Sequence, residues 1–197
     1  MKAGLMLAVN KDSVREKHDF YATDPAAIRL ALPTFREAGL SGPVWECACG
    51  AGHLSAPLLE AGYSVRSTDL IDRGYGDVLD FLSADEPWSG DILTNPPFKL
   101  AEAFIRHSMD ILEDGRKAFF FLKIQFLQSV DRKALFETYP PKYILINSQR
   151  IFCAMNGEFW RYAKWSEEKG MWTGGTQCFI WIVFEKGWSG QTTVKWI

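Results

Sequence analysis

Short apolar segments alternate with amphipathic segments along most of this chain, and such alternation is typical of an α/β fold. The first amphipathic segment follows Asp24-Pro25, where apolar residues recur at helical spacing through Ile28, Ala31 and Phe35 until Gly39. Aspartate is a favoured helix cap and proline is favoured at the first helical position. The pattern therefore predicts a helix that begins at Pro25 with Asp24 as its cap.

The remaining elements follow from the same alternation. Residues 1 to 19 are polar after Val9 and predict a loose arm. The last apolar segment, Gln177 to Glu185, is apolar at nearly every position, as expected for a strand buried on both faces. Strands are expected at 44–49, 63–68, 91–93, 117–122, 142–147 and 177–185, and further helices at 53–60, 100–113 and 131–139.

One segment, residues 150 to 176, departs from this alternation. Asn156-Gly157 lies between two aromatic-rich segments, and this dipeptide is a strong signal for a tight hairpin turn. The sequence therefore predicts a β-hairpin that pairs residues 151–155 with 158–162.

Candidate chemistry lies in the segment Asp91 to Phe98, which reads Asp-Ile-Leu-Thr-Asn-Pro-Pro-Phe. Pro96 and Pro97 end the strand, because neither has an N–H to donate. The loop would lie at the carboxyl end of a strand, where open α/β sheets bind ligands. Asn95 offers an amide oxygen, Pro96 a carbonyl and Phe98 a flat ring. Two acceptors on an NH2 group favour the pyramidal geometry that its nitrogen reaches during attack, so the predicted acceptor is an adenine-type amine or a carboxamide.

Asn-Pro-Pro-Phe after a strand resembles the catalytic motif of S-adenosylmethionine-dependent amino-methyltransferases, which include adenine-N6 enzymes and, with a Tyr variant, glutamine-N5 enzymes. The resemblance implies that the catalytic residues are Asn95, Pro96, Pro97 and Phe98. It also implies S-adenosylmethionine as cofactor.

Further motifs of the same family occur in the expected order. Tyr21-Ala-Thr23 resembles the segment that contacts the methionine end of the cofactor, and Glu46-x3-Gly50-x-Gly52 resembles the first cofactor motif. Position 55 is Ser, so the Gly-x-Gly-x-x-Gly pattern of dinucleotide-binding enzymes is incomplete. This difference argues against a nicotinamide-dependent enzyme.

Two acidic positions complete the cofactor set. Asp69 follows a strand and matches the carboxylate that holds ribose hydroxyls. Asp80-Phe81 resembles the motif in which an aspartate accepts from the adenine amine and a phenylalanine packs on the ring. The cofactor-binding residues predicted in this way are Tyr21, Thr23, Glu46, Cys47, Gly50, Gly52, Asp69, Leu70, Asp80 and Phe81.

The fold implied by the resemblance is the class I methyltransferase fold, which is Rossmann-like. It has a seven-stranded, mostly parallel sheet with an antiparallel last strand and helices on both faces. At 197 residues the chain is expected to form a single domain, 1–197. Its ending, with Phe184-Glu-Lys-Gly and Val-Lys-Trp196-Ile197, is similar to small phage or prophage-type adenine methyltransferases.

Composition limits the other classes of function. No apolar run approaches the roughly 20 residues that cross a bilayer, so a cytoplasmic protein is expected. The four cysteines form no Cys-x-x-Cys pair, and we expect reduced thiols and no metal. The net charge of −2 argues against a general polyanion binder.

The charge distribution is more informative than the total. Residues 1 to 122 hold 12 basic and 18 acidic residues, whereas residues 123 to 197 hold 10 basic and 6 acidic residues. Aromatic faces among basic residues suit unstacked bases and phosphates. An alternative is that the aromatic residues of 150–176 only cover the edge of the sheet. The predicted nucleic-acid-binding residues are Lys123, Arg150, Trp160, Arg161 and Lys164.

The sequence thus predicts methyl transfer to the N6 amine of adenine in DNA, with the 150–176 segment as a target-recognition element. A base inside a duplex must be flipped out or single-stranded to react. RNA adenine, glutamine-N5 of a protein and a cofactor-binding module without catalysis remain alternatives. Monomer and homodimer both remain open.

Overall fold

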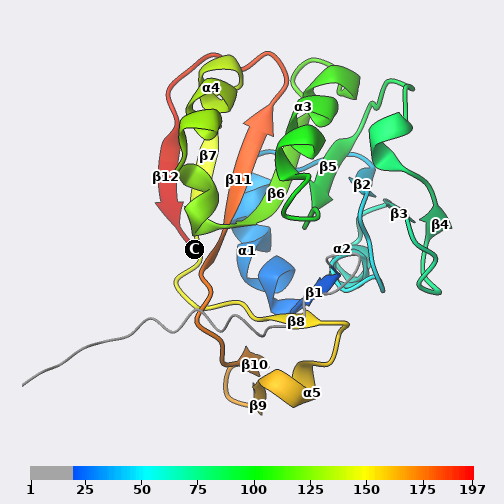
Figure 1. The fold of residues 1–197 in the computed structure, drawn as a ribbon, viewed down its shortest axis with the longest axis vertical. Coiled ribbons are helices and arrows are strands. Elements are labelled where there is room, and N and C mark those ends of the chain that lie inside the picture. Colours follow the sequence, from blue (N-terminus) through cyan, green and yellow to red (C-terminus); the bar gives the residue numbers. More distant parts are fainter. Residues whose placement is uncertain (1–19) are drawn as a thin grey trace, which may run out of the picture.

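The computed structural model of the protein describes residues 20–197 and is built on one large mixed sheet (Figure 1). The predicted arm at residues 1–19 lies outside the described residues. The sheet has eight strands in the order β12-β7-β11-β6-β5-β2-β3-β4. Their bounds are β2 Val44–Glu46, β3 Val65–Asp69, β4 Asp77–Val78, β5 Asp91–Thr94, β6 Lys117–Lys123, β7 Tyr143–Ile146, β11 Phe179–Glu185 and β12 Thr193–Trp196.

The directions of the strands confirm the predicted fold class. The strands from β4 through β6 are parallel to one another, and β11 is antiparallel to both of its neighbours, β6 and β7. The sheet differs from the prediction in one respect. An eighth strand, β12, pairs in parallel with β7 at the edge, so the antiparallel strand β11 is not the last strand of the chain.

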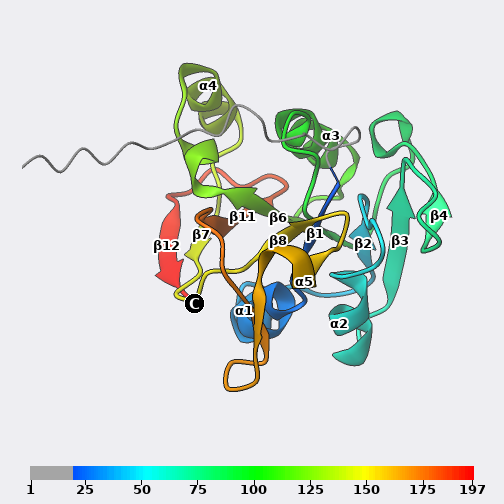
Figure 2. The ribbon, with the colours of Figure 1, turned by 60° about the horizontal axis from the view of Figure 1, so that its bottom comes forward.

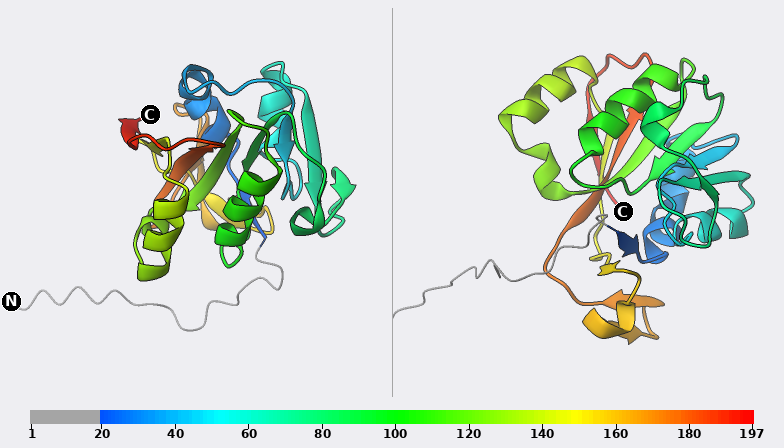
Figure 3. Two further views of the ribbon diagram at one scale, coloured as in Figure 1. Left: turned by 90° about the horizontal axis from the view of Figure 1, so that it is seen from above. Right: turned by 45° about the vertical axis from the view of Figure 1, so that its right-hand side comes forward.

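Helices cover both faces of the sheet (Figure 3). Helices α1 (Ala26–Glu37) and α2 (Ser55–Glu60) lie on one face, and α3 (Ala101–Ile111) and α4 (Val130–Thr138) lie on the other. Strand β6 explains why both faces are covered. Phe119 and Phe121 pack in the cluster with α1, whereas Phe120 and Leu122 pack in the cluster with α3. Because successive side chains of a strand point to opposite faces, this apolar strand needs cover on both sides.

Two short elements connect the chain near its start to the 150–176 segment. Strand β1 (Tyr21–Thr23) pairs antiparallel with β8 (Cys153–Met155), outside the large sheet. After β8 the chain forms a short helix, α5 (Phe159–Tyr162), and then a hairpin of β9 (Lys164–Ser166) and β10 (Met171–Thr173). Figure 1 shows α5 and this hairpin beyond the end of the sheet where β1 and β8 lie, and Figure 2 shows that end turned toward the viewer.

The predicted hairpin between 151–155 and 158–162 is therefore wrong. Asn156 and Gly157 do form a turn with positive φ, 53° and 73°. The residues after the turn form α5 instead, because the pairing edge of β8 is occupied by β1 and Phe159 is buried against Ala22 and Ala154. The hairpin of this segment lies further along the chain, between β9 and β10.

Helix α1 begins one residue later than predicted, but the predicted cap is in place. The backbone N–H of Ala26 donates to Asp24 Oδ1 at 2.9 Å. The second carboxylate oxygen of Asp24 accepts from the N–H of Trp172 in β10 at 2.7 Å. Asp24 is fully buried, so one carboxylate joins the start of α1 to the β9–β10 hairpin.

Candidate active site

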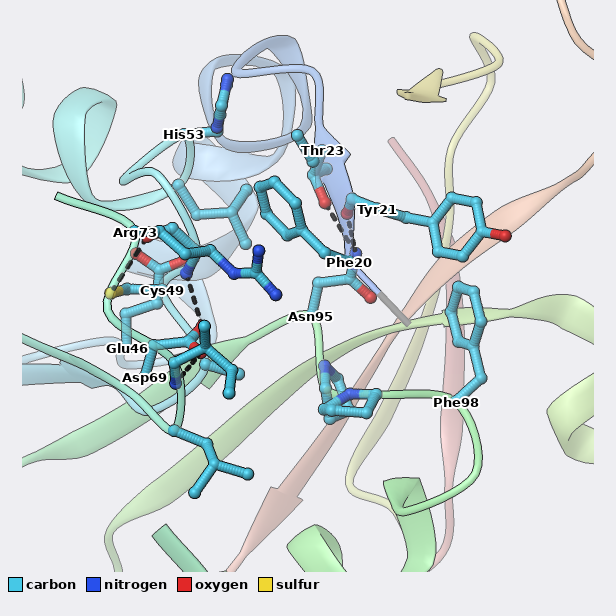
Figure 4. Close-up of a pocket in the computed structure, with 18 of the residues that line it drawn as sticks. Phe20, Tyr21, Thr23, Glu46, Cys49, His53, Asp69, Arg73, Asn95 and Phe98 are labelled. Atoms are coloured by element: carbon cyan, nitrogen blue, oxygen red, sulfur yellow. Dashed lines mark hydrogen bonds between the residues drawn. The ribbon is translucent and has the colours of Figure 1, made fainter. Parts of the chain in front are cut away.

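A cavity of about 370 Å³ lies at the carboxyl ends of β2, β3 and β5 (Figure 4). This is the position where open α/β sheets bind ligands. Segments far apart in the sequence meet there, among them β1, the loops after β2 and β3, and the loop after β5. Most of the residues predicted from the sequence line this cavity, namely Tyr21, Thr23, Glu46, Gly50, Asp69, Leu70, Asn95, Pro96, Pro97 and Phe98.

Asn95 is fixed by strand β1. Its amide nitrogen donates to Thr23 Oγ1 at 2.8 Å and to the carbonyl of Tyr21 at 3.3 Å. These two bonds decide which way the amide points, so the oxygen Oδ1 is the atom left for a ligand. Oδ1 is buried and has no hydrogen-bond partner in the structure. An unpaired buried carbonyl costs roughly 1–3 kcal/mol, which a ligand N–H would recover.

Glu46 presents a buried carboxyl group to the cavity. It ends strand β2, is 2% exposed, and accepts a hydrogen bond from Ser55 Oγ at the start of α2. Burial raises the pKa of Glu46 from 4.5 to about 8, the hydrogen bond from Ser55 opposing this effect. A cation bound beside Glu46 would favour the charged carboxylate and lower this pKa.

Asp69 and Gly50 join the ends of strands β3 and β2. The N–H of Gly50 donates to Asp69 Oδ2 at 2.8 Å, and the N–H of Ile71 donates to Asp69 Oδ1 at 2.9 Å. Gly50 has a φ of 55°, and a Cβ at this position would lie 2.4 Å from the ring of Phe20. Each carboxylate oxygen keeps a second lone pair, so Asp69 can still accept from ligand hydroxyls.

Phe98 lies within a group of side chains at one end of the cavity. The Tyr21 ring is 6.0 Å from the Phe98 ring, the Phe179 ring is 6.1 Å away, and Lys123 Nζ is 4.5 Å from the Phe98 centroid. Phe98 and Tyr21 also line a second cavity of about 160 Å³, which contains Lys123, Phe152 and Gln177. The Asn95 site therefore adjoins two cavities that share the same aromatic wall.

Four of the predicted cofactor residues do not line the main cavity. Cys47 and Phe81 are both 2% exposed and pack in the cluster between the sheet and α3. Burial raises the pKa of Cys47 well above its usual value. Gly52 is covered by the ring of Tyr75, which would lie 2.5 Å from an added Cβ. Asp80 is exposed, and its side chain accepts from the N–H of Leu82 in a short 3-10 helix, Phe81–Ser83.

Phe81 is held away from the cavity by aromatic packing. The centroid of its ring lies 5.2 Å from that of Trp45, 4.9 Å from that of Phe104 and 4.9 Å from that of His107. The structure therefore does not support the predicted contact of Phe81 with an adenine ring. His107 packs on Phe81 and does not line the cavity.

Several residues that line the cavity were not predicted. The cavity includes Phe20, Ala48, Cys49, His53, Leu54, Ile71, Arg73, Lys99 and Leu100. Cys49 and Leu54 flank the glycine turn, so the motif itself marks their neighbourhood. Phe20 and Arg73 have no local signal in the sequence, because their positions depend on how the loops fold over the sheet. Burial raises the pKa of Cys49 to about 12 and lowers that of His53.

The residues predicted to bind nucleic acid lie outside the main cavity. Lys123 lines the second cavity. Arg150 lines an open groove together with Lys169, and this groove shares Gly174 and Gly175 with the second cavity. Trp160, Arg161 and Lys164 are exposed on α5 and β9, with Trp160 72% exposed. Arg161 pairs with Glu158 at 3.0 Å.

Within residues 20–197, none of the helices has both the length and the apolar character that spanning a bilayer requires. No group of three or more His, Cys, Asp or Glu side chains within the same range could hold a metal ion.

Comparison of the sequence with protein-family models and with curated proteins gives no match. Solved structures do match. A Listeria monocytogenes protein (lmo1582), described as a candidate class I S-adenosylmethionine-dependent methyltransferase, aligns with a TM-score of 0.59 at 12% identity, over 91% of this chain and 67% of that one. TrmN from Thermus thermophilus aligns with a TM-score of 0.51 at 16% identity, over 82% of this chain and 51% of that one. The type IIG restriction endonuclease BpuSI aligns with a TM-score of 0.55 at 13% identity, over 84% of this chain and 25% of that one. This chain thus has the class I methyltransferase fold.

Proposed function

We propose that this protein transfers a methyl group from S-adenosylmethionine to the N6 amine of adenine in DNA. The observation that carries the proposal is the state of Asn95. Its nitrogen is held by Tyr21 and Thr23, while its buried oxygen lacks a partner at a cavity lined by two carboxyl groups. A site of this kind favours a ligand that brings an N–H to Asn95.

The residues of the cavity suit S-adenosylmethionine. A volume of about 370 Å³ falls in the range of small-molecule sites, roughly 300–1,000 Å³. Figure 4 shows Glu46 and Asp69 on one side of the cavity and Asn95 and Phe98 on the other. Glu46 would hold the cofactor ammonium and Asp69 its ribose hydroxyls. Bound there, the cofactor would supply a methyl group on a positively charged sulfur. This sulfur leaves as a neutral thioether and needs no metal to do so.

The groups around Asn95 suit an acceptor that carries an NH2 group. Asn95 Oδ1 would accept one hydrogen of an NH2 group, and the carbonyl of Pro96, which also lines the cavity, would accept the other. These bonds strengthen as the nitrogen gains positive charge, which is a selective stabilisation of the transition state. The proton released after transfer can pass to water, so no histidine base is required. The acceptor is therefore a delocalised amine such as that of adenine.

The second cavity supports a nucleic-acid acceptor. It contains Lys123 and the aromatic ring of Phe152, and it adjoins the open groove with Arg150 and Lys169. The second cavity and the groove would together form a path from the Asn95 site to the surface. A base next to Asn95 could direct its phosphate along this path toward the basic side chains. The basic excess of residues 123 to 197 is in keeping with this path.

Stacking of the base between Tyr21 and Phe98 requires a local movement. Two contacts of about 3.5 Å each need about 7 Å between the flanking rings, whereas Tyr21 and Phe98 are 6.0 Å apart. The Tyr21 side chain must therefore rotate away as the base enters. Tyr21 is half-buried at the end of the described chain, in the short strand β1, so a rotation of its ring does not disturb the large sheet.

The test is methyl incorporation from tritiated S-adenosylmethionine into adenine-containing single-stranded DNA. We expect Asn95→Ala to lower the rate roughly 100- to 1,000-fold, the usual effect of losing one transition-state hydrogen bond, with little change in cofactor affinity. Asn147→Ala is the matched control, because Asn147 also follows a strand and donates to a backbone carbonyl, Phe179 O, at 2.9 Å. It should retain full activity.

Three outcomes would decide against the proposal in different ways. Equal incorporation by wild type and Asn95→Ala would remove Asn95 from the reaction. Methylation of RNA or of a glutamine peptide, with none of DNA, would keep the chemistry and change the substrate. Cofactor binding without turnover on any of these substrates would favour a binding module.

A further inference from the structure

Arg73, in the loop after β3, places a guanidinium in the main cavity (Figure 4). Its Cζ lies 4.1 Å from the centroid of the Phe20 ring, a distance typical of a cation–π contact. Its Nε is buried and has no hydrogen-bond partner in the structure. A cationic group thus lies inside the cavity, supported on an aromatic face.

The two carboxyl groups of the cavity do not neutralise Arg73. Glu46 accepts from Ser55, and Asp69 accepts from the backbone of Gly50 and Ile71. Within residues 20–197, neither of them forms an ion pair with Arg73. Arginine offers five N–H donors in a planar fork that matches a carboxylate or a phosphate. The unpaired Nε indicates that the natural partner of this fork is an anion of a ligand.

We propose that Arg73 binds the α-carboxylate of S-adenosylmethionine. This inference rests on the proposed function, and it assigns the one anionic group of that cofactor. Its ammonium and carboxylate are attached to the same carbon, so a cation-binding carboxyl and an anion-binding guanidinium must line the same cavity, as Glu46 and Arg73 do. Phe20 holds the plane of the guanidinium, and this pre-organisation reduces the entropy lost on binding.

The experiment compares two ligands that differ only in the carboxylate. Calorimetry would measure the binding of S-adenosylmethionine and of decarboxylated S-adenosylmethionine to wild type, Arg73→Gln and Arg66→Gln. Arg66 is the matched control, because its guanidinium also stacks on an aromatic ring, Trp45 at 4.3 Å, but does not line the cavity. No nucleic acid is present, so activity plays no part in the readout.

We expect Arg73→Gln to weaken binding of S-adenosylmethionine roughly 10- to 100-fold, the range for hydrogen bonds to charged groups. Decarboxylated S-adenosylmethionine should bind wild type more weakly than S-adenosylmethionine does, by a similar factor. Arg73→Gln should bind this decarboxylated ligand as tightly as wild type does. Arg66→Gln should match wild type with both ligands.

Several results would overturn the inference. Equal weakening of both ligands by Arg73→Gln would place Arg73 against another part of the cofactor. Equal affinity of wild type for the two ligands would show that no residue of the protein, Arg73 included, gains affinity from the carboxylate. Weaker binding of an oligonucleotide with unchanged cofactor affinity would assign Arg73 to a phosphate. If wild type bound neither ligand, the proposed function itself would fail.

Discussion

Glu46 and Asp69 are both acidic and both line the cavity, but their surroundings differ. Glu46 is buried and accepts a side-chain hydrogen bond from Ser55, so burial raises its pKa to about 8. Asp69 accepts two backbone N–H groups at the ends of two neighbouring strands. Under the proposed function the two residues would contact different parts of the ligand, a cation for Glu46 and hydroxyl groups for Asp69.

The raised pKa of Glu46 predicts how stability changes with pH. Between its unfolded value of 4.5 and its folded value of about 8, only the folded chain holds the extra proton. The resulting stabilisation is present below pH 4.5 and is lost as pH rises through 8. Glutamine has no proton to lose. We therefore expect the free energy of unfolding of wild type, relative to Glu46→Gln, to fall by about 2–3 kcal/mol between pH 5.5 and 7.5.

Urea denaturation at several pH values, without ligand, would measure this difference. Glu60→Gln is the control, because Glu60 is exposed on α2 and should follow wild type at every pH. If the free energy of unfolding changed with pH in the same way for wild type and Glu46→Gln, Glu46 would have the same pKa in the folded and unfolded chains, against the prediction.

Single residues could be predicted from the sequence where a short motif fixes the backbone. Asn95 follows a strand and precedes two prolines, so its place at the end of β5 could be predicted from three neighbours. Arg73 could not be predicted, since its cavity position depends on Phe20, 53 residues earlier in the chain. Phe81 is predicted from the resemblance of Asp80-Phe81 to a family motif and from its place between Asp69 and Asn95, and the sequence does not show that its ring packs beside Trp45 instead.

At the scale of elements, the segment around β1 and β8 shows the limit of local signals. Asn156-Gly157 correctly predicts a turn, but the turn does not select the partner of β8. That partner is β1, more than 130 residues away in the chain. The pairing has a consequence for the candidate site, because Thr23 and Tyr21 of β1 hold the amide of Asn95. The 150–176 segment thus supports the Asn95 loop through β1.

Asp24 provides a test of this connection between elements. Its carboxylate accepts from Ala26 at the start of α1 and from Trp172 in β10, and it is fully buried. We expect Asp24→Ala to lower the free energy of unfolding by about 1–3 kcal/mol, because two buried amide donors lose their acceptor. Chemical denaturation would measure the change. Asp72→Ala is the control, since Asp72 is exposed and, among residues 20–197, its side chain accepts only from the N–H of Gly74, at 2.9 Å. A similar loss of stability in Asp72→Ala would contradict the assignment.

At the scale of the whole molecule, the site is assembled at one end of the sheet. The alternation of apolar and amphipathic segments permits a parallel sheet, but its strand directions were expected from the family resemblance and not from the pattern itself. Strand β4, Asp77–Val78, is exposed and carries no apolar pattern that could predict it. Strand β12 escaped prediction since it lies at an edge and its residues Thr193, Val194 and Trp196 are exposed. Figure 1 shows α5, β9 and β10 at the end of the sheet where the loop after β5 lies. This arrangement places the aromatic and basic segment beside the proposed acceptor site.

This arrangement predicts a role for an exposed tryptophan. Trp160 on α5 is 72% exposed and belongs to the aromatic and basic segment beside the proposed acceptor site. If it stacks on a base beside the reacting one, its removal costs roughly 1–3 kcal/mol. We expect Trp160→Ala to weaken binding of single-stranded DNA roughly 5- to 100-fold, measured by fluorescence anisotropy at fixed salt. Trp196→Ala is the matched control, since Trp196 is 71% exposed on the edge strand β12.

The basic residues of the same segment should act through charge, and their effect can be separated from stacking. Lys164 is exposed on β9, so Lys164→Gln should weaken binding of every sequence alike and reduce the slope of log affinity against log salt by about 0.7 for a single strand. Trp160→Ala should leave that slope unchanged. If both variants bound DNA as wild type does, with the same slope, the 150–176 segment would serve only to cover the sheet and to hold β1, and recognition of the substrate would lie with Lys123 and the second cavity.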